Sequence, residues 1–288
     1  MGPLDLVKLP ALMQRTRGDP RVRVAVVDGP VEFADPSLAG ARLSEIPGHR
    51  GMCEFASSTA CRHGTFVAAI LSARRGSGAP AICPDCTLLV RPIFAEANSE
   101  MPTAAADELA EAILDCLDAG ALVLNISAAL ARASLKSERN LEEALDECAR
   151  RGAIVVVAAG NQGSLGSTAI TRHPWVIPVV ACDLRVRPMT NTNLGRSIGR
   201  QGVAAPGSGV MSLDAAGRPR SIYGTSVAAP FVSGTIALLW SVFPGVTAGD
   251  MRIAVTRPYV RRTVVPPLLD AWRSYQHLAA TAVEGACA

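Results

Sequence analysis

The chain has 288 residues, of which 49% are apolar and 18% charged, a balance typical of a compact protein rather than a disordered one. The net charge of +3 is small and aromatic residues make up only 4%, so the composition argues against a nucleic-acid-binding protein. Residues 1–10 contain no apolar core behind a basic patch, so we expect no secretory signal and a cytoplasmic location.

Short apolar, β-branched runs alternate along the chain with segments of helical spacing. We expect strands at 22–27, 87–90, 122–126, 153–158, 176–181 and 202–205. We expect helices at 63–73, 104–119, 138–151, 225–243, 247–255 and 267–280. This alternation predicts an α/β fold with a mostly parallel central sheet and helices on both faces.

No internal repeat or low-complexity linker interrupts this pattern. We therefore expect a single domain over 1–288, with a core at about 20–260 and a helical tail at about 261–288. The uncharged stretch from Ser226 to Phe243 is long enough to cross a bilayer. Pro230, Gly234 and the small residues around them favour a buried helix of a soluble protein instead, so we expect no membrane partner.

The chain has eight cysteines, at positions 53, 61, 83, 86, 116, 148, 182 and 287. Without a secretory signal we expect most of them to be reduced, with at most one local disulfide. Cys83 and Cys86 have the C-x-x-C spacing, but a zinc site needs a second pair of ligands that the sequence lacks, so we expect no metal and no cofactor. Cys53 and Cys61 flank the approach to His63, and the sequence leaves open whether they are bonded.

Four polar residues stand at positions where a parallel α/β sheet gathers its functional groups. Asp28 directly follows the first expected strand, although an aspartate there is most often a turn residue. His63 lies at the expected start of a helix among small neighbours that permit close packing. Ser226 begins the long uncharged helix, whose amino-terminal partial charge suits a nucleophile that generates an oxyanion. Asn161 follows another strand, and its amide is able to donate to that oxyanion beside the backbone N–H of Ser226.

The order Asp, His, Asn, Ser makes the pattern specific. The blocks Val24-Ala-Val-Val-Asp28-Gly, His63-Gly-Thr, Ala159-Gly-Asn161 and Gly224-Thr-Ser226-Val-Ala-Ala-Pro230 resemble the signature blocks of the subtilisin-like (S8) serine proteases. This resemblance implies a subtilisin-like three-layer fold and a serine endopeptidase. It also implies a catalytic triad of Asp28, His63 and Ser226, with Asn161 in the oxyanion hole.

The same resemblance places substrate as an extended strand along one sheet edge. The matching segment is Asn125-Ile-Ser127-Ala128-Ala129, where Ala128 and Ala129 replace the glycines of many relatives and are expected to narrow the cleft. The wall of the primary specificity pocket is expected at Ala158, Ala159 and Gly160.

A narrower resemblance concerns the proteases of cyanobactin maturation, which process ribosomally made precursor peptides. Leu4-Asp-Leu, Gly18-Asp-Pro, Pro84-Asp-Cys86 and Arg91-Pro-Ile-Phe94 look like segments of that family. Its macrocyclising branch carries a helical cap inserted before the His helix. His63 follows Asp28 by only 35 positions, which favours the branch that cleaves the leader peptide.

Two other interpretations remain. One is a general intracellular or exported subtilisin that degrades proteins. The other is a pseudo-protease that binds a peptide without cutting it, which the complete triad disfavours. In each case the partner is a peptide or protein; for leader cleavage it is a precursor peptide, and biosynthetic proteins are further expected partners.

Overall fold

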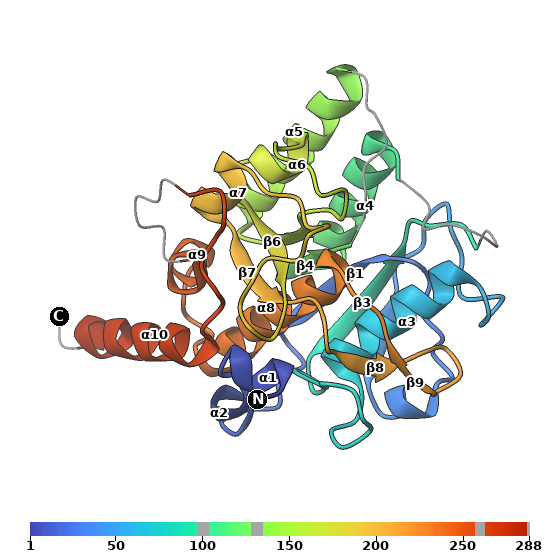
Figure 1. Cartoon of the computed structure of the whole chain (residues 1–288), viewed down its shortest axis with the longest axis horizontal. Helices are drawn as coiled ribbons and strands as arrows, with labels where there is room; N and C mark the ends of the chain where they lie inside the picture. Colours follow the sequence, from blue (N-terminus) through green and yellow to red (C-terminus); the bar gives the residue numbers. More distant parts are fainter. Residues whose placement is uncertain (97–103, 128–134, 257–262, 287–288) are drawn as a thin grey trace.

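The computed structural model describes residues 1–96, 104–127, 135–256 and 263–286. Its centre is a seven-stranded sheet of order β2-β3-β1-β4-β5-β6-β7, in which all neighbouring strands are parallel. Helices cover both faces of the sheet (Figure 1), which confirms the predicted fold class. The strands are β1 (Arg23–Asp28), β2 (Arg42–Glu45), β3 (Thr87–Pro92), β4 (Val123–Ile126), β5 (Ile154–Ala158), β6 (Val176–Cys182) and β7 (Val203–Pro206).

Six of these strands lie within two residues of their predicted bounds, and only β2 was missed. β2 is an edge strand whose residues alternate between exposed and half-buried, and it has a charged residue at each end. It therefore lacks the apolar run by which the buried strands are visible in the sequence. A two-stranded antiparallel hairpin, β8 (Met211–Leu213) and β9 (Pro219–Ser221), was also missed.

The helices are α1 (Pro3–Leu6), α2 (Leu9–Met13), α3 (Thr59–Ser72), α4 (Ala106–Asp118), α5 (Leu135–Arg151), α6 (Ala169–Arg172), α7 (Arg196–Gln201), α8 (Thr225–Val242), α9 (Ala248–Thr256) and α10 (Ala271–Ala286), with a 3-10 turn at Pro36–Leu38. Alternate residues of β1 face opposite cores. Val24 and Val26 pack in the core that contains α3 and α8, whereas Ala25 and Val27 pack in the core on the opposite face, against α4. The short helices α1, α2, α6 and α7 had not been predicted.

Helix α8 crosses one face of the sheet and contacts β4, β5, β6 and β7. Within the described part of the chain it is the one helix long and apolar enough to span a membrane, yet 89% of that window is buried inside the fold. Its burial agrees with the predicted core helix. At the end of the chain, α10 packs against α2, and the N–H of Ala271 donates to the carbonyl of Val7 at 2.9 Å.

Helix α3 begins earlier than the sequence predicted. It was expected to start at His63 but starts at Thr59, with the Ser58 hydroxyl accepting the N–H of Cys61 at 3.1 Å as its N-cap. Ser58 stands in a run of small and polar residues without helical periodicity, so the sequence pattern did not reveal the start that the capping bond marks. His63 is therefore the fifth residue of the helix.

The first turns of α3 lie unusually close to the chain that follows β1. A Cβ added to Gly29 would lie 2.1 Å from the carbonyl oxygen of Ala60. A Cβ added to Gly64 would lie 2.3 Å from the carbonyl oxygen of Gly29 and 2.4 Å from that of Pro30. Two glycines thus permit the helix that carries His63 to approach the residue directly after Asp28.

Gly64→Ala should lower the free energy of unfolding by about 1–3 kcal/mol, because the added methyl group meets backbone that has little room to move. Urea and thermal denaturation of the variant against the wild type measure this loss. Gly245→Ala is the matched control, since its added Cβ has no neighbour within 4 Å. Equal stability of the Gly64→Ala variant and the wild type would contradict the close packing.

Candidate active site

Asp28, His63 and Ser226 form one chain of hydrogen bonds. Nδ1 of His63 lies 2.7 Å from Oδ1 of Asp28, and Nε2 of His63 lies 2.9 Å from Oγ of Ser226. The side chain of Asp28 is fully buried, and His63 and Ser226 are each only 8% exposed. An ionised carboxylate only accepts, so Nδ1 carries the hydrogen and Nε2 accepts from the serine hydroxyl. The three residues predicted from separate motifs therefore meet in the structure.

The environment of His63 combines two opposing effects on its pKa. Burial by itself lowers the pKa, because desolvation disfavours the imidazolium. The charge of Asp28 and its hydrogen bond oppose that effect and raise the pKa of His63 above its ordinary value. Oδ1 of Asp28 also accepts the N–H of Gly29 at 2.6 Å, which fixes the carboxylate beneath the ring. The site thus holds an imidazole that can take a proton and an anion that stabilises the resulting imidazolium.

Ser226 lies in the first turn of the 18-residue helix α8. The first N–H groups of a helix have no intrahelical acceptor, and the helix dipole places partial positive charge at that end. Gly224, the N-cap, has a φ of +132° and donates its N–H to the carbonyl of Gly207 at 2.9 Å. The bend at Gly224 places the serine at the carboxyl edge of the sheet with its N–H available to a developing anion.

The side chain of Asn161 is oriented by Thr225. Oδ1 of Asn161 accepts the N–H of Thr225 at 2.9 Å and its hydroxyl at 3.1 Å. The Thr225 hydroxyl in turn accepts the N–H of Gly160 at 3.2 Å. With Oδ1 engaged, Nδ2 of Asn161 keeps its hydrogens unpaired among the described residues and stands beside the start of α8. Asn161 was predicted from the sequence but Thr225 was not, although Thr225 lies directly before Ser226 in the same sequence block.

Those predicted substrate-binding residues that the structure describes lie at the carboxyl ends of the neighbouring strands β4 and β5. Ser127 follows β4, is 5% exposed and donates its N–H to the carbonyl of Val27 at 3.2 Å. Ala128 and Ala129 lie outside the described residues. Ala158 ends β5, and Ala159 donates its N–H to Val179.

Asn193 fixes the segment after β5. Its Nδ2 donates to the carbonyl of Ala159 at 3.1 Å, and its backbone N–H donates to the carbonyl of Gly160 at 2.9 Å. Its Oδ1 accepts the N–H groups of Gln162 and Ser164, both at 3.0 Å. Nothing in the sequence pattern indicated this role, because Asn193 is far from the segment along the chain.

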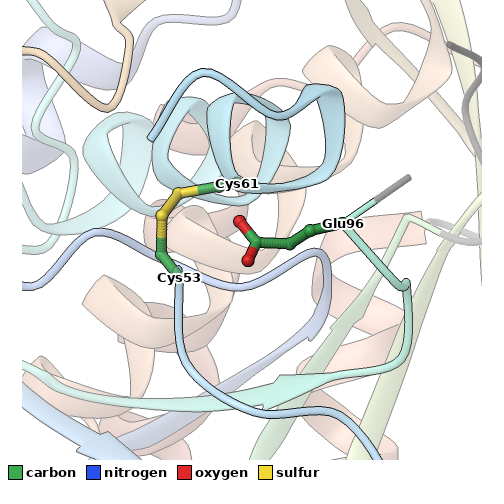
Figure 2. A group of neighbouring side chains, drawn as sticks. All are labelled: Cys53, Cys61 and Glu96. Carbon is green, nitrogen blue, oxygen red and sulfur yellow. A yellow bond between two sulfur atoms is a disulfide. The ribbon is translucent and has the colours of Figure 1, made fainter. Parts of the chain in front are cut away.

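One group of side chains in the described chain has the composition of a metal site. The ligand atoms of Cys53, Cys61 and Glu96 lie within 4.8 Å of one another (Figure 2). The two cysteines are bonded to each other, so they offer no thiolate to a metal in this form. The C-x-x-C pair, Cys83 and Cys86, consists of buried free thiols.

Comparison with known proteins identifies the family. The family model described as "Subtilase family" matches residues 20–266. The chain belongs to the subtilase family. Curated relatives include subtilisin E of Bacillus subtilis, 29% identical over 255 residues that cover 86% of this chain and 63% of that protein. Thermitase of Thermoactinomyces vulgaris is 27% identical and covers 81% of this chain and 79% of that protein.

Solved structures extend the comparison to maturation proteases. The protease domain of PatA, as a mutant, is 30% identical with a TM-score of 0.81 and covers 92% of this chain and 97% of that chain. The prenylagaramide maturation protease PagA is 28% identical with a TM-score of 0.81, and the match covers 94% of this chain and 98% of that chain. The PatG macrocyclase, at 19% identity and a TM-score of 0.82, shares the fold. These matches confirm the resemblance to the cyanobactin maturation proteases that the sequence indicated.

Asp28→Asn should lower the pKa of His63, because the substitution removes the negative charge that outweighs burial. An NMR titration of the His63 ring nitrogens in the two proteins measures the change. The resonances of the exposed His277 should be the same in both and provide the control. An unchanged or higher pKa in the variant would show that Asp28 does not set the protonation of His63.

Proposed function

We propose that the chain is a serine endopeptidase that cleaves the leader from a ribosomally made precursor peptide. The observation that carries the proposal is the buried hydrogen-bonded chain from Asp28 through His63 to Ser226, with distances of 2.7 and 2.9 Å. In this arrangement a nucleophile is hydrogen-bonded to a general base, and a third group orients that base. Serine proteases use it for acyl transfer. The chain spans 63% of the length of subtilisin E, so its substrates and partners are part of the proposal.

In the proposed reaction, Oγ of Ser226 attacks the scissile carbonyl while Nε2 of His63 takes the hydroxyl proton. Asp28 keeps the proton of Nδ1 in place and stabilises the imidazolium. The tetrahedral oxyanion accepts hydrogen bonds from the N–H of Ser226 and from Nδ2 of Asn161. His63 then gives its proton to the leaving amine, and water releases the acyl group by the same route in reverse.

Substrate is proposed to bind as an extended strand at the carboxyl edge of the sheet, with Ser127 on one side and 158–160 as the pocket wall. The wall residues Ala158 and Ala159 are small, and Gly160 has a φ of +106°, which favours glycine. Asn193 donates hydrogen bonds to the carbonyls of Ala159 and Gly160 and so fixes the backbone of this wall. The rigid backbone supports a fixed subsite for the side chain before the cut.

Leader cleavage, rather than macrocyclisation, is supported by the connection between Asp28 and α3. Residues 29–58 are all described, and they contain only the 3-10 turn Pro36–Leu38 and strand β2. No inserted helical cap precedes the helix of His63 within this connection. Similarity to the protease domain of PatA and to PagA at 28–30% identity over more than 90% of each chain adds to this support.

A general degradative subtilisin is the second candidate, because the chain is 29% identical to subtilisin E over 86% of its length. A peptide-binding pseudo-protease is disfavoured by the complete hydrogen-bonded triad. A cytoplasmic location and biosynthetic partner proteins remain part of the proposal. Among the described residues five cysteines are free and buried, which fits a reducing compartment, whereas Cys53 and Cys61 are joined in a disulfide.

A digest of a peptide library that includes precursor-like sequences should give a few cuts within one narrow motif, read by mass spectrometry. The same digest with Ser226→Ala should give none, because the nucleophile is absent. Broad cutting by the wild type would favour the degradative enzyme. No cutting, together with no labelling of Ser226 by a fluorophosphonate, would contradict a protease.

Asn161→Ala should lower kcat by about 10²–10³-fold with little change in KM, the range known for this donor in a subtilisin. The physical reason is that the amide contacts the oxyanion only after attack. Thr225→Val should give a smaller loss, since it removes one of the two hydrogen bonds that orient the amide. Steady-state kinetics on one cleaved peptide measure both. A rise in KM at constant kcat would assign Asn161 to ground-state binding instead.

A further inference from the structure

The segment at residues 47–58, which leads to α3 and His63, makes few backbone hydrogen bonds. Ile46 donates its N–H to the carbonyl of Val90, and a Cβ on Gly48 would meet the buried guanidinium of Arg91, so the beginning of the segment is fixed. Residues 49–57 are mostly exposed. Between residues 47 and 58 the one backbone–backbone hydrogen bond in the described chain joins Ser58 to Phe55 at 2.8 Å. The geometry of the segment next to α3 therefore depends on side chains.

Glu96 supplies the first of these ties from the chain that follows β3. Its carboxylate accepts the N–H of Glu54 at 2.8 Å, the N–H of Phe55 at 3.1 Å and the hydroxyl of Ser58 at 2.7 Å. Ser58 is the N-cap of α3 and accepts the N–H of Cys61 at 3.1 Å. One carboxylate thus connects the exposed segment to the cap of the helix that carries His63.

The disulfide between Cys53 and Cys61 supplies the second tie. It joins the segment to the first turn of α3, two residues before His63. Figure 2 shows the Glu96 carboxylate pointing toward the Cys53–Cys61 pair. Cys61 is buried, whereas Cys53 is partly exposed, so a small thiol in solution can reach the bond from the Cys53 side.

We propose that the Cys53–Cys61 disulfide and the Glu96 carboxylate form a redox-sensitive clasp that positions His63 for proton transfer. The inference rests on the proposed protease function. A dithiol opens the clasp by thiol–disulfide exchange: the Cys53–Cys61 bond breaks, the reductant becomes a cyclic disulfide, and two electrons and two protons pass to the two cysteines. Glu96 is a positioning residue, since it acts through the start of α3 and does not contact substrate.

Opening the clasp frees the segment at Cys53 and leaves the first turn of α3 held by the Ser58 cap and by packing on Gly29. A displacement of about an ångström between Nε2 of His63 and Oγ of Ser226 lowers the rate of proton transfer without weakening substrate binding. The reduced enzyme should therefore keep its KM and lose kcat.

Peptide mapping tests the bond itself. Protein purified without reductant and treated with oxidised glutathione should give a linked peptide that contains Cys53 and Cys61. The buried thiols at positions 83, 86, 116, 148 and 182 should be alkylated after denaturation. Failure of Cys53 and Cys61 to link would overturn the inference.

Kinetics on one cleaved peptide test the consequence, with EDTA present because two thiols and a carboxylate are ligands that zinc accepts. Dithiothreitol should lower kcat of the wild type about tenfold or more with KM changed less than twofold, and reoxidation should restore it. The double variant Cys53→Ala/Cys61→Ala should have the low kcat from the start and show no response. Equal kcat in the two redox states of the wild type would overturn the clasp.

Substitution of the carboxylate tests the second arm. Glu96→Ala should lower kcat of the oxidised enzyme, and Glu96→Gln should fall between it and the wild type because one acceptor oxygen remains. Glu111→Gln is the matched control, since Glu111 bonds the exposed His49 of the same segment at 3.1 Å and should leave kcat unchanged. A Glu96→Ala variant with lower melting temperature but unchanged kcat would refute the positioning role.

Labelling with a fluorophosphonate distinguishes a failure of the clasp from a failure of the proposed protease function. A wild type that neither labels at Ser226 nor cuts in either redox state refutes the protease and the clasp together. A wild type that labels and cuts equally well in both states refutes the clasp alone.

Discussion

The fully buried carboxylate of Asp28 is the constraint on which the site depends. A buried charge is tolerated only when neighbours compensate it, and here one oxygen accepts both the ring of His63 at 2.7 Å and the N–H of Gly29 at 2.6 Å. The first of these bonds requires α3 to lie directly against the chain after β1. Glycines at 29 and 64 remove the Cβ atoms that would prevent that approach. The charge and the packing thus both act on the position of α3.

The parallel sheet brings the other residues of the site next to Asp28. β1 lies beside β4, and β4 beside β5, so Asp28, Ser127 and Gly160 emerge at adjacent points of one edge. Helix α8 packs across β4 to β7, and Ser226 in its first turn lies at the same carboxyl ends of the strands, although it is far from Asp28 in the sequence. Thr225, one residue earlier, bonds Asn161 and the N–H of Gly160. A single turn of α8 therefore aligns nucleophile, oxyanion donor and pocket wall.

The sequence predicted the buried strands and the four polar site residues because each has a local signal. Central strands are continuous apolar runs, and the site residues stand in short blocks whose order is specific. The edge strand β2 has no such run and was missed. The start of α3 at Thr59 was misplaced because the residues before His63 show no helical periodicity. Asn193 and Glu96 act on segments about 30 or more positions away, which no local pattern reveals.

The chemistry of the thiols concentrates redox sensitivity at one point of the fold. Burial raises the pKa of Cys148 and of Cys182 to about 12 and raises that of Cys116 further, so these thiols are protonated and inert. A hydrogen bond with Cys83 lowers the pKa of Cys86 against burial, but Cys86 is only 1% exposed. Cys53 alone among the described cysteines is partly exposed, and its partner Cys61 begins the turn that carries His63. A reductant or oxidant in solution therefore acts first where the chain leads into the catalytic helix, while the core thiols remain unchanged.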